Sequence, residues 1–206
     1  MRFAWSTEPS YAATPVGLNE AKAQLRIDLS DTSHDVIVGA KLKSANAWVA
    51  RMLGLSLAPG IGDVYYDSFP AEDSPFLIPY PPLTSITHVK YTDSASTQTT
   101  LTATTDYLVD TVASPGRVVL AYSKSWPSTD LYPVNPIVIR FVCGYAAGAV
   151  PDPILEAILW LTDHLFHHPE MVLVGATTTL ASVLPFGMLL ALEEYGIADY
   201  GTLWAQ

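Results

Sequence analysis

The sequence predicts an α+β fold, in which a helical frame holds an inserted antiparallel β-sheet or small β-sandwich. Two observations predict it. Apolar residues repeat every three or four positions over residues 14–58 and again over 150–206, a spacing typical of helices. Over residues 59–147 the period changes to two and turn residues recur, which is typical of short strands. We therefore expect one domain (1–206) made of an N-terminal helical hairpin, a β insertion, and C-terminal helices with a tail.

The hairpin begins at Gly17, which can act as N-cap, with Glu20 at the capping-box position. This first helix is short and ends near Ile27. A polar turn leads into a second helix over about 34–53, where Gly54 is a good left-handed stop.

The second helix carries both an apolar repeat and a run of small residues. The repeat, which we expect to be a packing face, is Ile37, Ala40, Ala45, Trp48 and Met52. The small residues would let another helix or a second subunit approach closely. The subunit contact that we expect consists of Ala40, Ser44, Ala47, Trp48 and Arg51.

Six short segments of the insertion are rich in β-branched and aromatic residues and are separated by turn residues. We predict strands at 64–69, 76–78, 86–92, 107–109, 117–120 and 137–142. The Thr-rich segment 97–105 is interpreted as a mobile hairpin tip.

The C-terminal part predicts two further helices. The first begins with Asp152 as N-cap and Pro153 at the first helical position, and it stops before Pro169. Its apolar face is Ile154, Ile158, Leu161 and Leu165. The second covers 186–195, and a partly apolar tail (196–206) follows.

Composition narrows the class of protein. The net charge is −10, and residues 141–206 contain seven acids and no Lys or Arg. Tight nucleic-acid binding needs clustered basic groups, so the charge argues against it. The longest apolar run is too short to span a membrane, and no signal peptide is apparent. We expect a protein made and used in a cytoplasm, or in a particle assembled there.

Candidate catalytic groups are few. His164 and His168 lie one helical turn apart, a spacing that can share a metal, but no third ligand stands at a defined spacing. A histidine at a helix C-terminus is also favoured by the helix dipole without a metal. Cys143 lacks a basic neighbour and is expected to pack as a small apolar residue. No motif offers a mechanism, so we expect neither enzymatic activity nor a cofactor.

The aromatic residues of the insertion leave two interpretations open. They fill the sheet core or a subunit contact, or they form a platform that recognises a glycan or a protein. The second interpretation makes the chain a β-rich binding module of a virion or cell surface. The aromatics concerned are Tyr65, Tyr66, Tyr91, Tyr122, Trp126 and Tyr132.

Seven short motifs in a fixed order resemble the head–tail connector (adaptor, or head-completion) proteins of tailed bacteriophages and gene transfer agents. The similarity covers about residues 15–195. The motifs lie at Leu18–Asp28, Pro79–Ile86, Asp106-Tyr107 with Pro115–Val118, Ser125–Pro127, Val142–Tyr145, Val150–Ile154 and Leu184–Gly187. Residues 1–13 and 196–206 fall outside the resemblance.

The resemblance implies a structural role in the neck of a virion or virus-like particle, assembled in a bacterial cytoplasm. It implies a homo-oligomeric ring of about twelve copies beneath the portal protein. The ring would extend the channel for double-stranded DNA, which passes without specific binding, and it would dock a tail-side stopper or head-completion protein.

Two further contacts are expected on this basis. Portal docking is expected of the apolar C-terminal region, through Phe186, Leu189, Leu190, Leu192, Tyr195, Ile197, Tyr200, Leu203 and Trp204. Contact with the tail-side partner or a neighbouring subunit is expected of the β insertion, through Thr97, Gln98, Thr99, Thr100 and Trp126.

Overall fold

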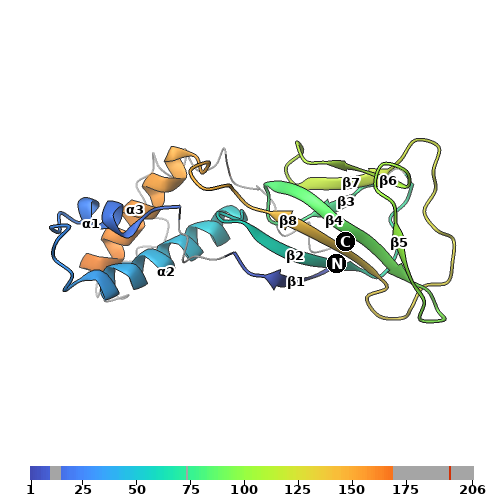
Figure 1. Cartoon of the computed structure of the whole chain (residues 1–206), viewed down its shortest axis with the longest axis horizontal. Coiled ribbons are helices and arrows are strands. Elements are labelled where there is room, and N and C mark those ends of the chain that lie inside the picture. Colours follow the sequence, from blue (N-terminus) through green and yellow to red (C-terminus); the bar gives the residue numbers. More distant parts are fainter. Residues whose placement is uncertain (10–14, 73, 169–194, 196–206) are drawn as a thin grey trace, which may run out of the picture. The chain divides into compact units, whose positions relative to one another are not determined.

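The computed structural model describes residues 1–9, 15–72, 74–168 and 195. These residues divide into two compact units. The β unit contains residues 1–9 and 59–144, and the helical unit contains 15–58, 145–168 and Tyr195. Figure 1 labels the helices and strands of both units. The β unit takes in residues 1–9 beside the expected insertion, and the one-domain organisation stays a prediction.

The helical unit has three helices among its described residues: α1 (Leu18–Gln24), α2 (Asp35–Leu53) and α3 (Asp152–His167). The capping of α1 is confirmed, since Glu20 Oε2 accepts a hydrogen bond from the Gly17 backbone N–H at 2.7 Å. The stop of α2 is confirmed as well, because Gly54 adopts the left-handed conformation with φ 67°. The N-cap of α3 is Pro151, one residue earlier than expected, so that Asp152 lies in the first turn.

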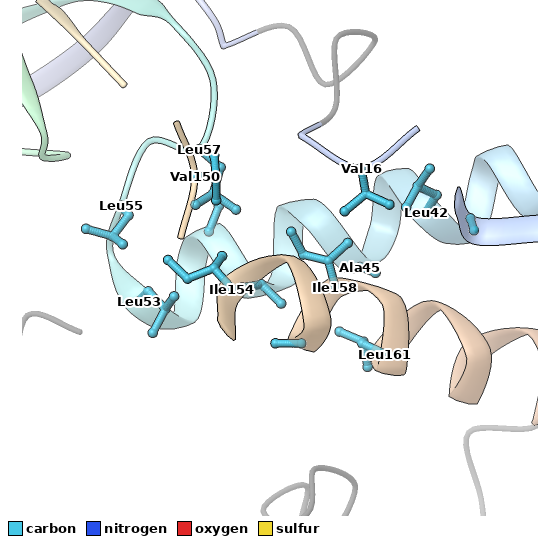
Figure 2. Close-up of a cluster of buried hydrophobic side chains, with 14 of the residues drawn as sticks. Val16, Leu42, Ala45, Leu53, Leu55, Leu57, Val150, Ile154, Ile158 and Leu161 are labelled. Carbon is cyan, nitrogen blue, oxygen red and sulfur yellow. The ribbon is translucent and has the colours of Figure 1, made fainter. Parts of the chain in front are cut away.

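The core of the helical unit forms where α2 and α3 pack together (Figure 2). Ala45 from α2 meets Ile154, Ile158 and Leu161 from α3, and all are almost fully buried. The face predicted for α3 is therefore confirmed, with Leu165 partly buried against the same core. The segment after α2 adds Leu55 and Leu57.

The predicted packing face of α2 is confirmed at Ala45 and Trp48, which lie in or against the core, and is wrong at its other three residues. Its buried apolar side chains are Val38, Leu42, Ala45, Val49, Ala50 and Leu53. Ile37 and Met52 are instead 52% and 40% exposed. Apolar residues recur at helical spacing on both sides of this helix, so periodicity alone did not select the side that meets α3.

A buried lysine holds the loop between α1 and α2. Lys22 is 1% exposed, and its ammonium group donates to the backbone oxygens of Leu29 and Asp31 at 3.0 and 2.7 Å. It also pairs with the carboxylate of Asp35 at 2.9 Å, in the first turn of α2. One side chain thus ties α1 to the loop and to the start of the next helix.

The β unit has two antiparallel sheets. The larger has the strand order β1 (Arg2–Thr7), β2 (Gly60–Tyr66), β8 (Ile137–Cys143), β4 (Leu83–Thr92) and β5 (Gln98–Leu101). The smaller has the order β3 (Phe76–Ile78), β7 (Gly116–Leu120) and β6 (Tyr107–Asp110). All pairings in both sheets are antiparallel, so the mixed α+β class and the antiparallel insertion are confirmed.

Two strands were not predicted, and β2 begins and ends earlier than the expected 64–69. The N-terminal residues form β1, which pairs with β2 and was not predicted. The segment expected to be a mobile tip contains β5, which pairs with β4 from Val89↔Leu101 to Thr92↔Gln98. β5 is rich in threonine, a residue that favours strands, and its pairing partner supplies the ladder that the isolated segment lacks.

The core of the β unit is rich in aromatic side chains. Trp126 is 9% exposed and stacks on Phe69 with ring centroids 5.3 Å apart, while Phe76 meets its edge at 5.2 Å. A second group joins the motif residue Tyr80 to the strand β1, through ring centroid distances of 4.8 Å to Phe3 and 5.1 Å to Trp5. These contacts explain why β1 belongs to the sheet.

Gly116 lets the two sheets approach each other. A Cβ atom at this position would lie 2.5 Å from Cβ of Leu83, which belongs to the larger sheet. Only glycine leaves room for this contact between β7 and β4.

Candidate interaction surfaces

The described residues contain no group of three or more metal-ligating side chains. His164 and His168 lie with ring centroids 4.9 Å apart, and His167 approaches the Asp163 carboxylate at 3.3 Å. Cys143 is fully buried at the end of β8. It occupies the packing position that we expected.

A shallow pocket lies in the β unit. Its lining consists of Met1, Tyr66, Ser68, Pro70, Ser74, Pro75, Phe76 and Leu77. The Tyr66 hydroxyl donates to the Leu77 carbonyl at 2.6 Å, and burial raises its pKa.

The larger sheet has an outer face opposite its aromatic core. Residues alternate between the two faces of a strand, and the inward residues of β8 are Ile137, Ile139, Phe141 and Cys143. Val138, Arg140 and Val142 therefore point outward. The partners of these residues on the neighbouring strands define two rows across the sheet.

The first row runs Asp63, Arg140, His88 from β2 through β8 to β4. The Arg140 guanidinium donates to both oxygens of Asp63 at 2.8 Å, and Asp63 is only 6% exposed. This bidentate pair raises the pKa of Arg140. The pKa of His88 is lowered, first by partial burial and then by the positive charges of Lys90 and Arg140.

The second row runs Arg2, Tyr65, Val138, Lys90, Thr100 from β1 to β5. Arg2 donates to Asn135 Oδ1 at 2.7 Å and lies 4.0 Å from Asp67. Lys90 makes no ion pair with any residue that the structure describes. The two rows together place three cationic side chains around Tyr65 and Val138, with Asp63 as the single carboxylate within them.

The small-residue stripe predicted on α2 lies on the surface of that helix. Ala40, Ser44, Ala47 and Arg51 are exposed and Trp48 is half-buried. The Ser44 hydroxyl donates to the Ala40 carbonyl at 3.1 Å, so its hydrogen-bond donor is already satisfied within the helix. All five residues lie on α2, and the subunit contact stays a prediction.

The exposed face of α3 is acidic and carries one large aromatic. Asp152, Glu156 and Asp163 fall on the side of the helix opposite Ile154, Ile158 and Leu161. Trp160 lies among them and is 48% exposed.

The residues predicted for tail-side contact divide into two groups. Thr97, Gln98, Thr99 and Thr100 are exposed at the edge of the larger sheet, where β5 is the last strand. Trp126 belongs to the aromatic core instead, and its burial departs from the contact that we expected of it. Its aromatic neighbours account for its position.

The residues predicted for portal docking lie almost entirely outside the described residues. Phe186, Leu189, Leu190, Leu192, Ile197, Tyr200, Leu203 and Trp204 belong to this group. Tyr195 is described, and it is partly buried against the core of the helical unit. The motif Leu184–Gly187 also lies outside the described residues.

The binding-module interpretation depends on exposed aromatics, and most of those concerned are covered. Tyr122 is 96% exposed and Tyr132 is 42% exposed, whereas Tyr66 and Trp126 are largely buried. The two exposed tyrosines lie outside the named strands. No helix in the described part of the chain is long and apolar enough to cross a membrane.

Three solved structures contain chains with this fold. A chain from the neck of an empty gene transfer agent particle, computed with C6 symmetry, aligns with a TM-score of 0.71 and 19% identity. A chain from the virion of a native gene transfer agent particle aligns with a TM-score of 0.70 and 17% identity. A chain from the neck of the native particle, computed with C12 symmetry, aligns with a TM-score of 0.66 and 17% identity.

The likeness is one of fold. Each alignment covers 95% of this chain and 95% of the other. No protein-family model and no curated protein matches the sequence.

Sequence reasoning did not find the cationic outer face of the larger sheet. Its three cations come from β1, β4 and β8, which are far apart in the sequence and become neighbours only through strand pairing. The one available signal is the spacing of Lys90 from His88 and of Arg140 from Val138. Residues two apart in a strand point to the same face. That pattern indicates a half-exposed strand but not its neighbours.

Proposed function

We propose that this chain is a structural head–tail connector protein in the neck of a virion or gene transfer agent particle. The observation that carries the proposal is the fold likeness to neck chains over 95% of both chains. The order of the sequence motifs independently favours the same family. The proposed role is structural, with no reaction, cofactor or membrane involved.

The connector forms a closed ring, with about twelve copies as the copy number. A contact between two different patches of the same chain closes into a ring when its rotation divides a full turn evenly. The exposed stripe of α2, formed by Ala40, Ser44, Ala47 and Arg51, suits a close subunit contact because its side chains are short or flexible. One of the neck structures with this fold was computed with C12 symmetry.

The ring lies beneath the portal protein and extends the DNA channel. The acidic wall of the channel repels the DNA phosphates weakly, so double-stranded DNA passes through the ring without binding to it. The net charge of −10 and the absence of Lys and Arg from residues 141–206 support such a wall. No sequence-specific DNA contact is part of the proposal.

Two separate regions of the connector bind different proteins. The apolar C-terminal region, residues 186–204, docks on the portal protein. The β5 edge, with Thr97–Thr100, meets the tail-side stopper, since an edge strand offers unpaired backbone groups to a partner.

The test is co-assembly with the portal protein of the same particle, measured by native mass spectrometry. A complex with about twelve copies of the chain is the expected result. A chain that stays monomeric in the presence of the portal protein overturns the connector role.

Deleting residues 196–206 tests the portal contact. Loss of portal binding is expected, whereas binding equal to that of the full chain would exclude the tail from the contact. Replacing 97–100 with a Gly/Ser linker of equal length tests the tail-side contact in the same way. Attachment of the tail-side protein is then the readout, and portal binding is the internal control.

A further inference from the structure

The outer face of the larger sheet carries cations around an apolar centre, and the exposed face of α3 carries carboxylates around a tryptophan. We propose that α3 of one copy docks on the outer face of the five-stranded sheet of the neighbouring copy. This inference rests on the proposed ring and names a subunit contact within it, in addition to the contact proposed for α2.

The receiving surface is a half-buried apolar strip framed by cations. Val138 and Tyr65 stand side by side in one row, with Arg2 beyond Tyr65 and Lys90 beyond Val138. Arg140 lies in the next row, fixed in place by its two hydrogen bonds to Asp63. A partner for this surface needs an apolar or aromatic group at its centre and carboxylates at its rim.

The exposed face of α3 meets this description. Trp160 is flanked by Glu156 four residues before it and by Asp163 three residues after it, so both carboxylates lie on the same side of the helix. The Asp163 carboxylate also lies 3.3 Å from His167. Glu156 makes no ion pair with the described residues, and Trp160 is 48% exposed. Tryptophan and arginine are the side chains most often found at the energetic centres of protein interfaces.

A second copy of this chain fits the surface better than nucleic acid does. A phosphate backbone would use Arg2 and Lys90, but it offers nothing to the apolar Val138 and Tyr65 that lie between them. A helix that carries one aromatic between two carboxylates satisfies both the apolar centre and the charged rim.

The contact joins two different patches, which is the kind of interface that a ring requires. The sheet belongs to the β unit and α3 to the helical unit. Every copy therefore offers one patch of each kind and accepts one of each kind from its neighbours.

A charge exchange tests the contact. The full-length chain is assembled with the portal protein, and the concentration at half-maximal ring formation is measured by native mass spectrometry for Lys90→Glu, Glu156→Lys and the double variant. We expect each single reversal to raise that concentration at least about tenfold, because like charges facing each other across an interface are costly. The double variant restores assembly, since the pair is then reversed but complementary.

The matched control for Lys90→Glu is Lys124→Glu, which changes an exposed residue between β7 and β8 and should not shift the assembly midpoint. Thermal unfolding of every variant checks that the chain is folded. A second measurement needs no charge reversal: copies with Lys90→Cys are mixed with copies with Glu156→Cys and oxidised. We expect a cross-linked dimer of the two variants, with Cys143 inert because it is fully buried.

The outcomes separate this contact from the ring itself. A wild-type chain that never assembles with the portal protein overturns the ring and this contact with it. A wild-type ring that is indifferent to both reversals and gives no mixed cross-link overturns the contact alone. If Lys90→Glu assembles normally but loses retention on double-stranded DNA, the surface is a nucleic-acid contact and the inference is wrong.

Discussion

The two units differ in how they use a buried charge. In the helical unit, the partners of Lys22 are two backbone carbonyls and one carboxylate, and they lie 7 to 13 residues away in the sequence. In the β unit, Asp63 is covered by Arg140, which lies 77 residues away on the neighbouring strand. The first charge stabilises a local connection, and the second links strands that are distant in the chain.

The difference decides whether a second substitution can restore the stability that a first one removes. A side chain bound to backbone carbonyls has partners that no second substitution can remove. A side chain paired with another side chain belongs to a pair that can be replaced as a whole, often at little cost. The two units should therefore respond differently to single and double changes.

The largest effect is expected from Lys22→Met in the helical unit. The substitution leaves two carbonyl groups and the Asp35 carboxylate without their buried donor, and we expect a loss of about 3 kcal/mol in the free energy of unfolding. Urea denaturation followed by far-ultraviolet circular dichroism measures it. Lys43→Met, at an exposed position on α2, is the matched control and should change stability little.

Hydrogen exchange shows where this loss acts. Protection in α1 and in the loop after it should fall, while protection in β8 should not. A uniform loss over both units would mean that Lys22 stabilises more than its local loop.

A smaller effect is expected from Arg140→Met in the β unit. Asp63 then keeps a nearly buried carboxylate without its two hydrogen bonds, which costs about 2 kcal/mol. The double variant Asp63→Val with Arg140→Val should recover most of that loss, because valine fits an outward strand position. If the double variant is less stable than Arg140→Met, the pair does more than satisfy its own charges.

Gly116→Ala tests the close approach of the two sheets. The new Cβ would overlap the Leu83 side chain, and relief by a small backbone shift costs about 1.5 kcal/mol. The thermal unfolding midpoint should fall accordingly. Gly39→Ala is the control: it lies in α2 with open space around its Cβ, so it should be neutral or stabilising.

The smallest effect concerns pH and His88. Its pKa is lowered from the ordinary value of 6.5, so below that value the unfolded chain binds a proton that the folded chain resists. Stability therefore falls as the pH drops through the window that begins at 6.5. His88→Gln should reduce the fall between pH 7.5 and 5.5 in urea denaturation, and an unchanged pH dependence would assign the effect to other groups.

Local signals predicted much of the helical unit. The cap at Gly17, the stop at Gly54 and the apolar face of α3 depend on residues within one or two helical turns, and all three are confirmed. The buried side of α2 was not predicted, because that side is selected by α3, which lies about a hundred residues later. The burial of Lys22 was not predicted, because its partners come close to it only when the loop is folded.

The β unit was predicted less completely. The strands with strong alternation inside 59–147 were found, whereas β1 lies outside that stretch and the polar, Thr-rich β5 depends on its pairing with β4. Of the candidate surfaces, the stripe on α2 could be predicted from residue size. The cationic face of the sheet could not, because the cross-strand neighbours of Lys90 and Arg140 follow from register and not from local sequence.

The division of the helical unit into two stretches of sequence has a consequence for synthesis on the ribosome. The core that buries Ala45 also requires Ile154 and Ile158, whereas the described strands of the β unit are complete at Cys143. A domain folds when its last required segment has emerged, and emergence proceeds from the N-terminus. The nascent chain can thus complete the β unit while α1 and α2 still lack α3, so the unit whose helices are made first is finished last.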